Sequence, residues 1–257
     1  MKIVIIGSGN VATHLGKGLQ RAGHKILQVY SRSESSSKTL ARKLSCTFTS
    51  EIDHISNLAD FYFVALSDEA IKPFLQKFKI RDQVIIHTSG SVSISIFGKK
   101  FKNSGVFYPV QTFSMKRGVD FKNIPVCIEA NNAVAKKKIT TLAKSLTGKI
   151  HFLDSRQRKV IHLAAVFANN FSNHLLTMAE HLLRQENISF DLLRPLILES
   201  ALKVQHESPG DMQTGPAKRG DVMVLQEHLK MLSDKKQFRE IYKLISESIS
   251  EMSGIRL

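Results

Sequence analysis

A glycine-rich hexapeptide near the start of the chain has the spacing of a phosphate-binding loop. It reads Gly7-Ser8-Gly9-Asn10-Val11-Ala12, a G-x-G-x-x-A pattern that follows an apolar strand over 2–6 and precedes a helical pattern over 10–21. In such loops the first glycine permits a tight turn and the second lets the backbone approach a pyrophosphate, while a small third residue lets the helix pack closely on the sheet. The helix N-terminus adds free N–H groups and a partial positive charge. These six residues are therefore predicted to bind a dinucleotide.

The residues at the end of the second predicted strand, over 25–30, favour NADP(H) over NAD(H). An NAD site usually places an Asp or Glu about 20 residues after the glycine loop, where the carboxylate binds the ribose 2′-hydroxyl. Here these positions are Ser31, Arg32 and Ser33, and the first carboxylate is Glu34. A planar guanidinium suits a 2′-phosphate, and the two hydroxyls can add hydrogen bonds. We therefore expect NADP(H) as the cofactor, with NAD(H) as the less favoured alternative.

Two later strands, over 61–66 and 83–87, also end in residues suited to a ligand site. Ligands of open parallel sheets bind outside the carboxyl ends of the strands. We therefore expect cofactor contacts from the residues at these two strand ends, which are Leu66, Ser67, Thr88, Ser89 and Gly90. The segment 108–113, after a sixth strand, is expected to form a wall of the cleft, with Gln111 binding the substrate.

A polar stripe runs along an otherwise apolar helical segment in the second half of the chain. At about 100° per residue, His162, Asn169 and Asn173 fall on one helix face. Buried polar groups need partners, which another helix or a substrate could supply. Histidine as a residue type titrates near neutral pH and suits general acid–base catalysis. We expect His162 to donate a proton, Asn169 and Asn173 to orient the substrate, and the adjacent Asn170 to bind it.

A second polar segment of the helical half carries two adjacent cations. Lys218 and Arg219 lie in a glycine-flanked loop, directly before a predicted helix N-terminus at Asp221. Cations beside a helix N-terminus favour an anion. We expect both side chains to bind a carboxylate or phosphate of the substrate, and a solvated basic loop is the alternative interpretation.

The order of the predicted elements indicates two domains. Strands alternate with helices as far as residue 153, which predicts a doubly wound, mostly parallel α/β Rossmann domain over 1–154. From 155 to 257 all patterns are helical, with one long helix expected over 156–186 and further helices over 190–206, 222–232 and 235–252. These helices carry more apolar surface than a small domain buries, so we expect a homodimer.

Composition excludes several other classes of protein. The 257 residues include two cysteines, Cys46 and Cys127, without a CxxC pattern, which excludes a disulfide framework and a zinc site, and we expect no metal. The net charge of +15 is spread along the chain, and no nucleic-acid-binding motif accompanies it, so we expect no nucleic-acid partner. We find no secretion signal and no apolar run of about 20 residues, so we expect a cytoplasmic protein without a membrane partner.

The whole chain resembles the oxidoreductase family in which a Rossmann-like domain is followed by a domain of unknown function, DUF2520. Four motifs carry the resemblance: the loop Gly7–Ala12, His87-Thr88-Ser89-Gly90-Ser91, His162-Leu163-Ala164-Ala165 with Asn169-Asn170, and Thr214-Gly215-Pro216 with Arg219-Gly220-Asp221. More widely, the chain is similar to the 6-phosphogluconate dehydrogenase, pyrroline-5-carboxylate reductase, ketopantoate reductase and F420-dependent NADP reductase groups. Several of these use a lysine and an asparagine near the first helix of the second domain, where this chain has His162 and Asn169.

The resemblance and the candidate residues together predict an NADP(H)-dependent oxidoreductase. Its substrate is expected to be a small, anionic carbonyl or imine compound held in the cleft between the domains. Two alternatives stay open. The first is a non-catalytic NADP(H)-binding sensor or partner-binding module, since the polar stripe contains no lysine. The second is an F420- or flavin-linked NADP reductase.

Overall fold

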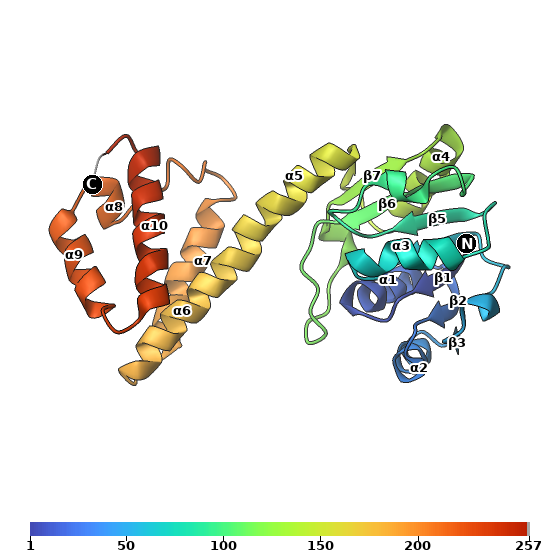
Figure 1. The fold of residues 1–257 in the computed structure, drawn as a ribbon, viewed down its shortest axis with the longest axis horizontal. Coiled ribbons are helices and arrows are strands. Elements are labelled where there is room, and N and C mark those ends of the chain that lie inside the picture. Colours follow the sequence, from blue (N-terminus) through green and yellow to red (C-terminus); the bar gives the residue numbers. More distant parts are fainter. Residues whose placement is uncertain (256–257) are drawn as a thin grey trace. The chain divides into compact units, whose positions relative to one another are not determined.

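The computed structural model describes residues 1–255. They form two compact units, one over Met1–Asn170 and the other from Phe171 onward. Figure 1 labels many of their helices and strands.

The first unit is built on an eight-stranded sheet with the strand order β3-β2-β1-β4-β5-β6-β7-β8. All neighbouring strands are parallel except β6 and β7, which are antiparallel. The strand order reverses at β1 and β4, which is where ligands bind in doubly wound sheets. The strands are β1 (Lys2–Ile6), β2 (Lys25–Tyr30), β3 (Thr47–Thr49), β4 (Phe61–Val64), β5 (Val84–His87), β6 (Asn103–Pro109), β7 (Val126–Ala130) and β8 (Ile150–Phe152).

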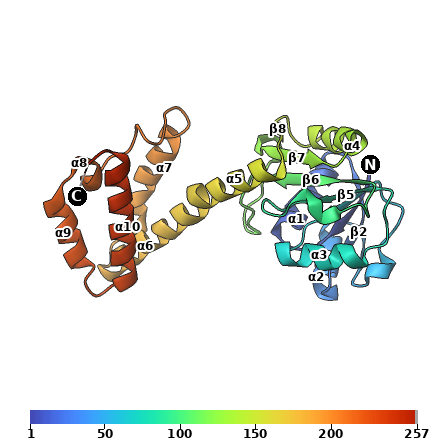
Figure 2. The same ribbon diagram turned by 45° about the horizontal axis from the view of Figure 1, so that its top comes forward.

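Helices cover both faces of this sheet (Figures 1 and 2). On one face, α1 (Asn10–Arg21), α2 (Glu34–Lys43) and α4 (Ala133–Lys144) bury their leucines and isoleucines against the strands. On the other face, α3 (Asp68–Lys77) buries Ile71, Phe74 and Leu75. Because both faces are covered, β4 and β5 are buried along their whole length, which is why they read as continuous apolar runs.

The remaining α-helices within residues 1–255, and a π-helical segment, follow the sheet. They are α5 (Ser155–Ala165), a π-helical segment (Val166–Phe171), α6 (Ser172–Gln185), α7 (Arg194–Lys203), α8 (Pro216–Arg219), α9 (Val222–Met231) and α10 (Lys236–Met252). The predicted fold class, a mostly parallel α/β domain followed by an all-α region, is confirmed. No helix within residues 1–255 combines the length and the apolar character needed to cross a bilayer.

The structure differs from the sequence-based expectation at three places. The short strand β3 was not predicted, because three residues carry too little periodicity. The helix expected over 156–186 contains the π-helical segment, in which each turn holds an extra residue. The loop expected before Asp221 contains the short helix α8, and Asp221 occupies the N-cap position of α9 without a side-chain hydrogen bond to the helix.

The start of α5 is specified by local sequence. Asp154 Oδ1 accepts a hydrogen bond of 2.7 Å from the Gln157 N–H, and Gln157 Oε1 accepts one of 3.0 Å from the Asp154 N–H. This reciprocal capping box satisfies two backbone donors that no helical turn can pair. The secondary structure therefore changes class after Asp154, whereas the first compact unit continues to Asn170 because α5 is hydrogen-bonded to the sheet.

Candidate functional site

The glycine loop has the geometry that a diphosphate requires. Gly7 has a φ of +118°, and a Cβ there would lie 2.1 Å from the carbonyl oxygen of Ala65, so both the conformation and the space demand glycine. A Cβ at Gly9 would meet nothing within 4 Å, which leaves open space in front of the helix N-terminus. Gly9 is the N-cap of α1 and has no capping side chain, so the first N–H groups of the helix are left for a ligand. The residues present fit a dinucleotide phosphate.

A pocket of about 550 Å³ lies at the carboxyl ends of β2 and β4. It brings together Arg32, Leu66 and Ser67, three of the residues expected to bind cofactor, with Phe74 and Lys77 of α3. Glu69 of α3 also lines it. An apolar wall with two cations and one carboxylate at its edge fits a purine and a phosphorylated ribose.

The two serines beside Arg32 hold the local structure. The Ser8 hydroxyl donates a hydrogen bond of 3.1 Å to Ser31 Oγ, which ties the glycine loop to the end of β2. Ser33 is the N-cap of α2, where its Oγ accepts from the Ser36 N–H at 3.4 Å. Their direct contact with a cofactor stays a prediction.

A larger pocket, of about 680 Å³, lies beside the start of α1 and is formed by the first unit alone. Its size is in the usual range for a cofactor end with a small substrate. The pocket joins residues from the glycine loop, the end of β6 and the segment after it, α5 and the π-helical segment. Among them are Asn10, Val11, Tyr108, Gln111, His162, Asn169 and Asn170. The structure thus brings six predicted site residues together with Tyr108.

Tyr108 and His162 form a hydrogen-bonded pair in this pocket. The Tyr108 hydroxyl lies 3.2 Å from His162 Nδ1, and the two rings meet edge to face with centroids 6.0 Å apart. Burial raises the pKa of the Tyr108 phenol, so the phenol stays protonated at neutral pH. Sequence reasoning placed Tyr108 in a wall of the cleft and did not foresee the pair, because the two residues are 54 positions apart.

Gly90 allows the pair to form. A Cβ at Gly90 would lie 2.7 Å from His162 Nδ1 and 2.9 Å from Tyr108 Cζ. Any side chain at this position would therefore displace one of the two rings. Gly90 was expected to contact the cofactor, and that role stays a prediction beside the packing role that the structure shows.

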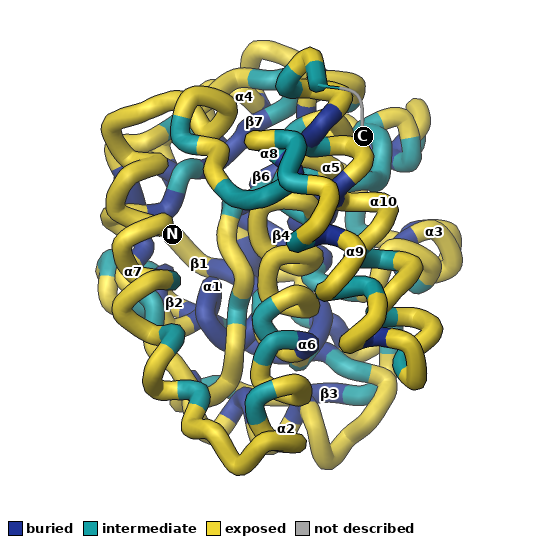
Figure 3. Tube along the Cα trace, turned by 90° about the vertical axis from the view of Figure 1, so that its left-hand side faces the viewer, coloured by how far each residue is buried: buried dark blue, intermediate teal, exposed yellow. Residues whose placement is uncertain are grey.

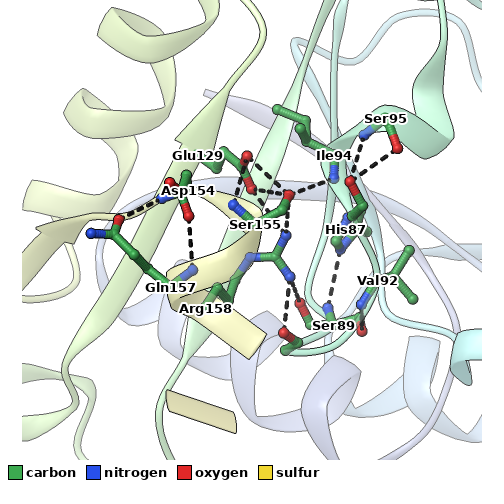
Figure 4. A network of polar contacts seen from close by, with 12 residues as sticks. His87, Ser89, Val92, Ile94, Ser95, Glu129, Asp154, Ser155, Gln157 and Arg158 are labelled. Carbon is green, nitrogen blue, oxygen red and sulfur yellow. Dashed lines mark hydrogen bonds and ion pairs between the residues drawn. The ribbon is translucent and has the colours of Figure 1, made fainter. Parts of the chain in front are cut away.

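The guanidinium of Arg158 is fully buried and joins α5 to the sheet (Figure 4). Nη1 donates to the carbonyl oxygens of Ser89 and Gly90 at 2.9 and 3.0 Å. Nη2 donates to Glu129 Oε2 at 3.0 Å and to Ser155 Oγ at 3.1 Å. Arg158 thus holds the loop after β5 against the helix that carries His162, one turn further on. Sequence reasoning missed it, since a single arginine in a charged run carries no signal of burial.

Side chains of β5 and of the loop itself add to the hold that Arg158 has on the loop after β5. The His87 ring is fully buried, and its Nδ1 accepts a hydrogen bond of 3.2 Å from the Ser89 N–H. Burial, assisted by the nearby Arg158 cation, lowers the pKa of His87 to about 3, so its ring is neutral. Ser89 Oγ accepts from the N–H groups of Ser91 and Val92, at 3.1 and 3.0 Å. The cofactor contacts expected from Thr88 and Ser89 stay predictions.

Three predicted site residues lie in the second unit. Asn173 is on α6, and Lys218 and Arg219 are on α8. The Arg219 guanidinium lies 3.9 Å from the Asp221 carboxylate; the Arg219 side chain is largely exposed and that of Asp221 is half-buried. The regular step of 100° that aligned Asn173 with His162 does not hold through the π-helical segment, because its turns are wider. The substrate roles of these three residues stay predictions.

Comparison with known proteins agrees with this geometry. Residues 2–90 match the family described as NADP oxidoreductase, coenzyme F420-dependent, and residues 124–249 match DUF2520, a domain of unknown function. A "putative NADP oxidoreductase" from Bacteroides fragilis is 42% identical, with a TM-score of 0.93 over 97% of this chain and 98% of that one. The chain belongs to this NADP oxidoreductase family. The resemblance inferred from the sequence is confirmed.

Other solved structures share the fold of this DUF2520 oxidoreductase family at low identity. A 1-pyrroline-5-carboxylate reductase from Streptococcus pyogenes is 15% identical, with a TM-score of 0.67 over 98% of both chains. An imine reductase from Myxococcus stipitatus, solved in complex with NADP⁺, is also 15% identical, with a TM-score of 0.65 over 98% of this chain and 93% of that one. No protein with a curated description matches the chain.

The buried ion pair between Arg158 and Glu129 allows a prediction about stability. Replacing Arg158 with Met removes the cation and leaves the Glu129 carboxylate, 14% exposed, without its counter-charge. We expect a loss of about 3–5 kcal/mol in the free energy of unfolding, measured by urea denaturation. The double variant Arg158→Met/Glu129→Gln should lose less than the sum of the two single variants, because neither charge is then left alone.

The exposed pair of Lys79 and Asp53, 2.7 Å apart, provides the matched control. The Lys79→Met variant should unfold close to the wild-type urea midpoint. Equal effects of Arg158→Met and Lys79→Met would show that the buried network does not hold α5 to the sheet.

Proposed function

We propose that the protein is an NADP(H)-dependent reductase of a small, anionic carbonyl or imine compound. One observation carries this proposal. The pocket that contains the Tyr108–His162 pair is also lined by Asn10 and Val11. These two residues begin helix α1, at whose N-terminus the cofactor phosphates would bind. A cofactor held by the glycine loop therefore has its reactive end within reach of a proton-donating pair.

The chain's own side chains divide the chemistry between them. Reduction of a C=O or C=N bond adds a hydride to carbon and a proton to oxygen or nitrogen, and NADPH supplies the hydride when it is bound. The His162 ring acts as a proton donor when both of its nitrogens carry a proton: Nδ1 then donates its hydrogen bond to the Tyr108 hydroxyl oxygen, and Nε2 gives its proton to the substrate, which leaves a neutral imidazole. The Tyr108 phenol holds the imidazole in position and stays protonated because of its raised pKa. The amides of Asn169 and Asn170, in the same pocket, can orient the substrate.

The preference for NADP(H) over NAD(H) is supported by the second pocket. Arg32 and Lys77 line it together, and no carboxylate lies between Tyr30 and Glu34 at the end of β2. Glu69 of α3 also lines this pocket. Two cations against one carboxylate, with no carboxylate at the end of β2, favour a 2′-phosphate over a ribose 2′-hydroxyl. The imine reductase with the same fold binds NADP⁺, which agrees with this assignment.

Turnover of NADPH tests the catalytic roles. In an assay with small keto acids and cyclic imines, including 1-pyrroline-5-carboxylate, His162→Ala should lower kcat about 10²–10⁴-fold, because a positioned proton donor is lost. Tyr108→Phe should cause a smaller loss, because the imidazole stays but is no longer held. NADPH binding, measured by calorimetry, should be retained in both variants.

The control for this assay is His174→Ala, which removes an exposed histidine of α6 and should leave turnover unchanged. Unchanged turnover in His162→Ala would show that the catalytic assignment is wrong. Tight NADPH binding by the wild type without reduction of any compound would favour a non-catalytic NADP(H)-binding module instead.

Cofactor selectivity tests Arg32 separately. Arg32→Ala should weaken NADPH binding about 10–100-fold, as expected for a lost charge-assisted hydrogen bond, and should change NADH binding little. The matched control is Arg42→Ala, which removes an exposed arginine that lies on α2. Parallel losses for NADPH and NADH in Arg32→Ala would contradict recognition of the 2′-phosphate by this side chain.

The family to which residues 2–90 belong favours a second candidate function. Its description names coenzyme F420, so a reduced deazaflavin could replace the organic substrate as hydride partner. NADP⁺ reduction by reduced F420, with no turnover of keto acids or imines, would support this candidate over the carbonyl or imine reductase.

We also propose that a second copy of the chain covers α7. None of the residues of this helix is buried, and Figure 3 shows the tube exposed along most of its length. Four leucines on α7 and the turn before it are each more than half exposed: Leu192, Leu196, Leu198 and Leu202. Monomers rarely expose apolar patches of this kind. Arg194, Glu199 and Lys203 give α7 charges of both signs, which suits a self-complementary two-fold interface.

Size-exclusion chromatography tests this dimer. The wild type should elute as a dimer at micromolar concentration, and Leu196→Lys should shift the elution toward the monomer, because it buries a charge in the interface. Leu244→Lys on α10, an equally exposed leucine, should elute as the wild type does. A monomeric wild type would overturn the proposal.

A further inference from the structure

The segment 110–118, here called the strap, crosses the N-terminal half of α1. It leaves the sheet after β6 and lies beside α1 as a long loop (Figure 1). The Asn10 Nδ2 group donates a hydrogen bond of 2.9 Å to the Phe113 carbonyl oxygen. His14 Nε2 donates one of 2.9 Å to the Ser114 carbonyl oxygen. Two side chains of the helix that follows the glycine loop therefore hold the backbone of the strap.

Aromatic stacking adds to these hydrogen bonds. The rings of His14 and Phe113 are stacked with centroids 5.3 Å apart, and Phe113 also stacks on Phe121 at 6.0 Å. His14 is only 7% exposed, so the helix side of this contact is rigid and buried. Gln111, Thr112 and the residues from Ser114 to Gly118 are exposed. Phe113 is thus the anchor of a segment that otherwise makes few buried contacts and can open at low cost.

The strap lines pockets on both sides of the phosphate loop. Gln111, Thr112 and Phe113 line the 680 Å³ pocket, together with Asn10 and Val11. Met115 lines a smaller pocket of about 220 Å³, whose other walls are Leu40 and polar residues of the glycine loop, α1 and α2, among them Ser8, Thr13, Ser36 and Lys43. The α1 N-terminus, where a pyrophosphate would bind, lies between these two groups of contacts.

We propose that the strap closes over the phosphates of the bound dinucleotide and sets how long the cofactor stays bound, with His14 as its positioning residue. This inference rests on the proposed function. Lys116 and Arg117 make the exposed tip of the strap cationic, which complements the negative charge of the cofactor phosphates. His14 acts through the strap, because its Nε2 is bound to the Ser114 carbonyl oxygen.

The proposal predicts a faster loss of cofactor when the anchor is removed. His14→Ala deletes one hydrogen bond and one ring contact, so the NADPH dissociation rate, measured by stopped-flow fluorescence, should rise about 10-fold. His14→Gln keeps an amide donor for the Ser114 carbonyl oxygen and should restore part of the wild-type rate. The control is His24→Ala, which removes a histidine just beyond the other end of α1 that is hydrogen-bonded to Ser145.

Limited trypsin digestion of the wild type gives a second readout that does not depend on the folding of a variant. Lys116 and Arg117 are exposed cleavage sites in the strap. Saturating NADPH should slow cleavage after these residues, while cleavage elsewhere in the chain serves as the internal reference.

The outcomes separate the strap from the proposed function. NADPH binding with unprotected Lys116 and Arg117, and with the wild-type dissociation rate in His14→Ala, overturns the strap and leaves the reductase proposal in place. No binding of NADPH to the folded wild type overturns the cofactor assignment itself, and the strap with it.

Discussion

The candidate substrate pocket depends on a single buried cation. Arg158 holds the carbonyl oxygens of Ser89 and Gly90 with one nitrogen and the Glu129 carboxylate with the other. A charge this deeply buried is stable only when it is paired and hydrogen-bonded, so the loop after β5, strand β7 and helix α5 are constrained together. His162 follows Arg158 by one helical turn and takes its place in the pocket as a consequence.

Two glycines shape the site because they carry no side chain. Gly7 accepts a backbone conformation and a close carbonyl contact that other residues cannot adopt, and this directs α1 toward the space in front of Gly9. Gly90 also permits a close contact, because the absence of a Cβ there leaves room for the Tyr108 and His162 rings. The glycine loop and the Tyr108–His162 pair therefore both depend on close approach of the backbone.

The π-helical segment lies where the first unit ends and the second begins. Its wide turns place the adjacent residues Asn169 and Asn170 in the same pocket. Along the chain, the regular helix α5 precedes this segment and α6 follows it. The strap forms one wall of this pocket through Gln111, Thr112 and Phe113. Under the proposed function, opening of the strap would let the enzyme exchange its cofactor between turnovers.

The order and type of most helices and strands, the phosphate loop and the family could be predicted from the sequence alone. These features are local: buried parallel strands are continuous apolar runs, helices show their own period, and the glycine spacing of the loop lies within six residues. The short strand β3, the π-helical segment and helix α8 could not be predicted, because they are too short to show a period.

Only the tertiary structure showed which distant residues meet. Arg158 reaches Ser89 across 69 positions, and Tyr108 reaches His162 across 54. Whether an arginine is buried or a tyrosine is paired depends on contacts between strands and helices far apart in the chain, and no local pattern records them. The sequence by itself therefore determined the architecture and the cofactor loop, whereas the packing of α5 against the sheet decided which side chains share the pocket.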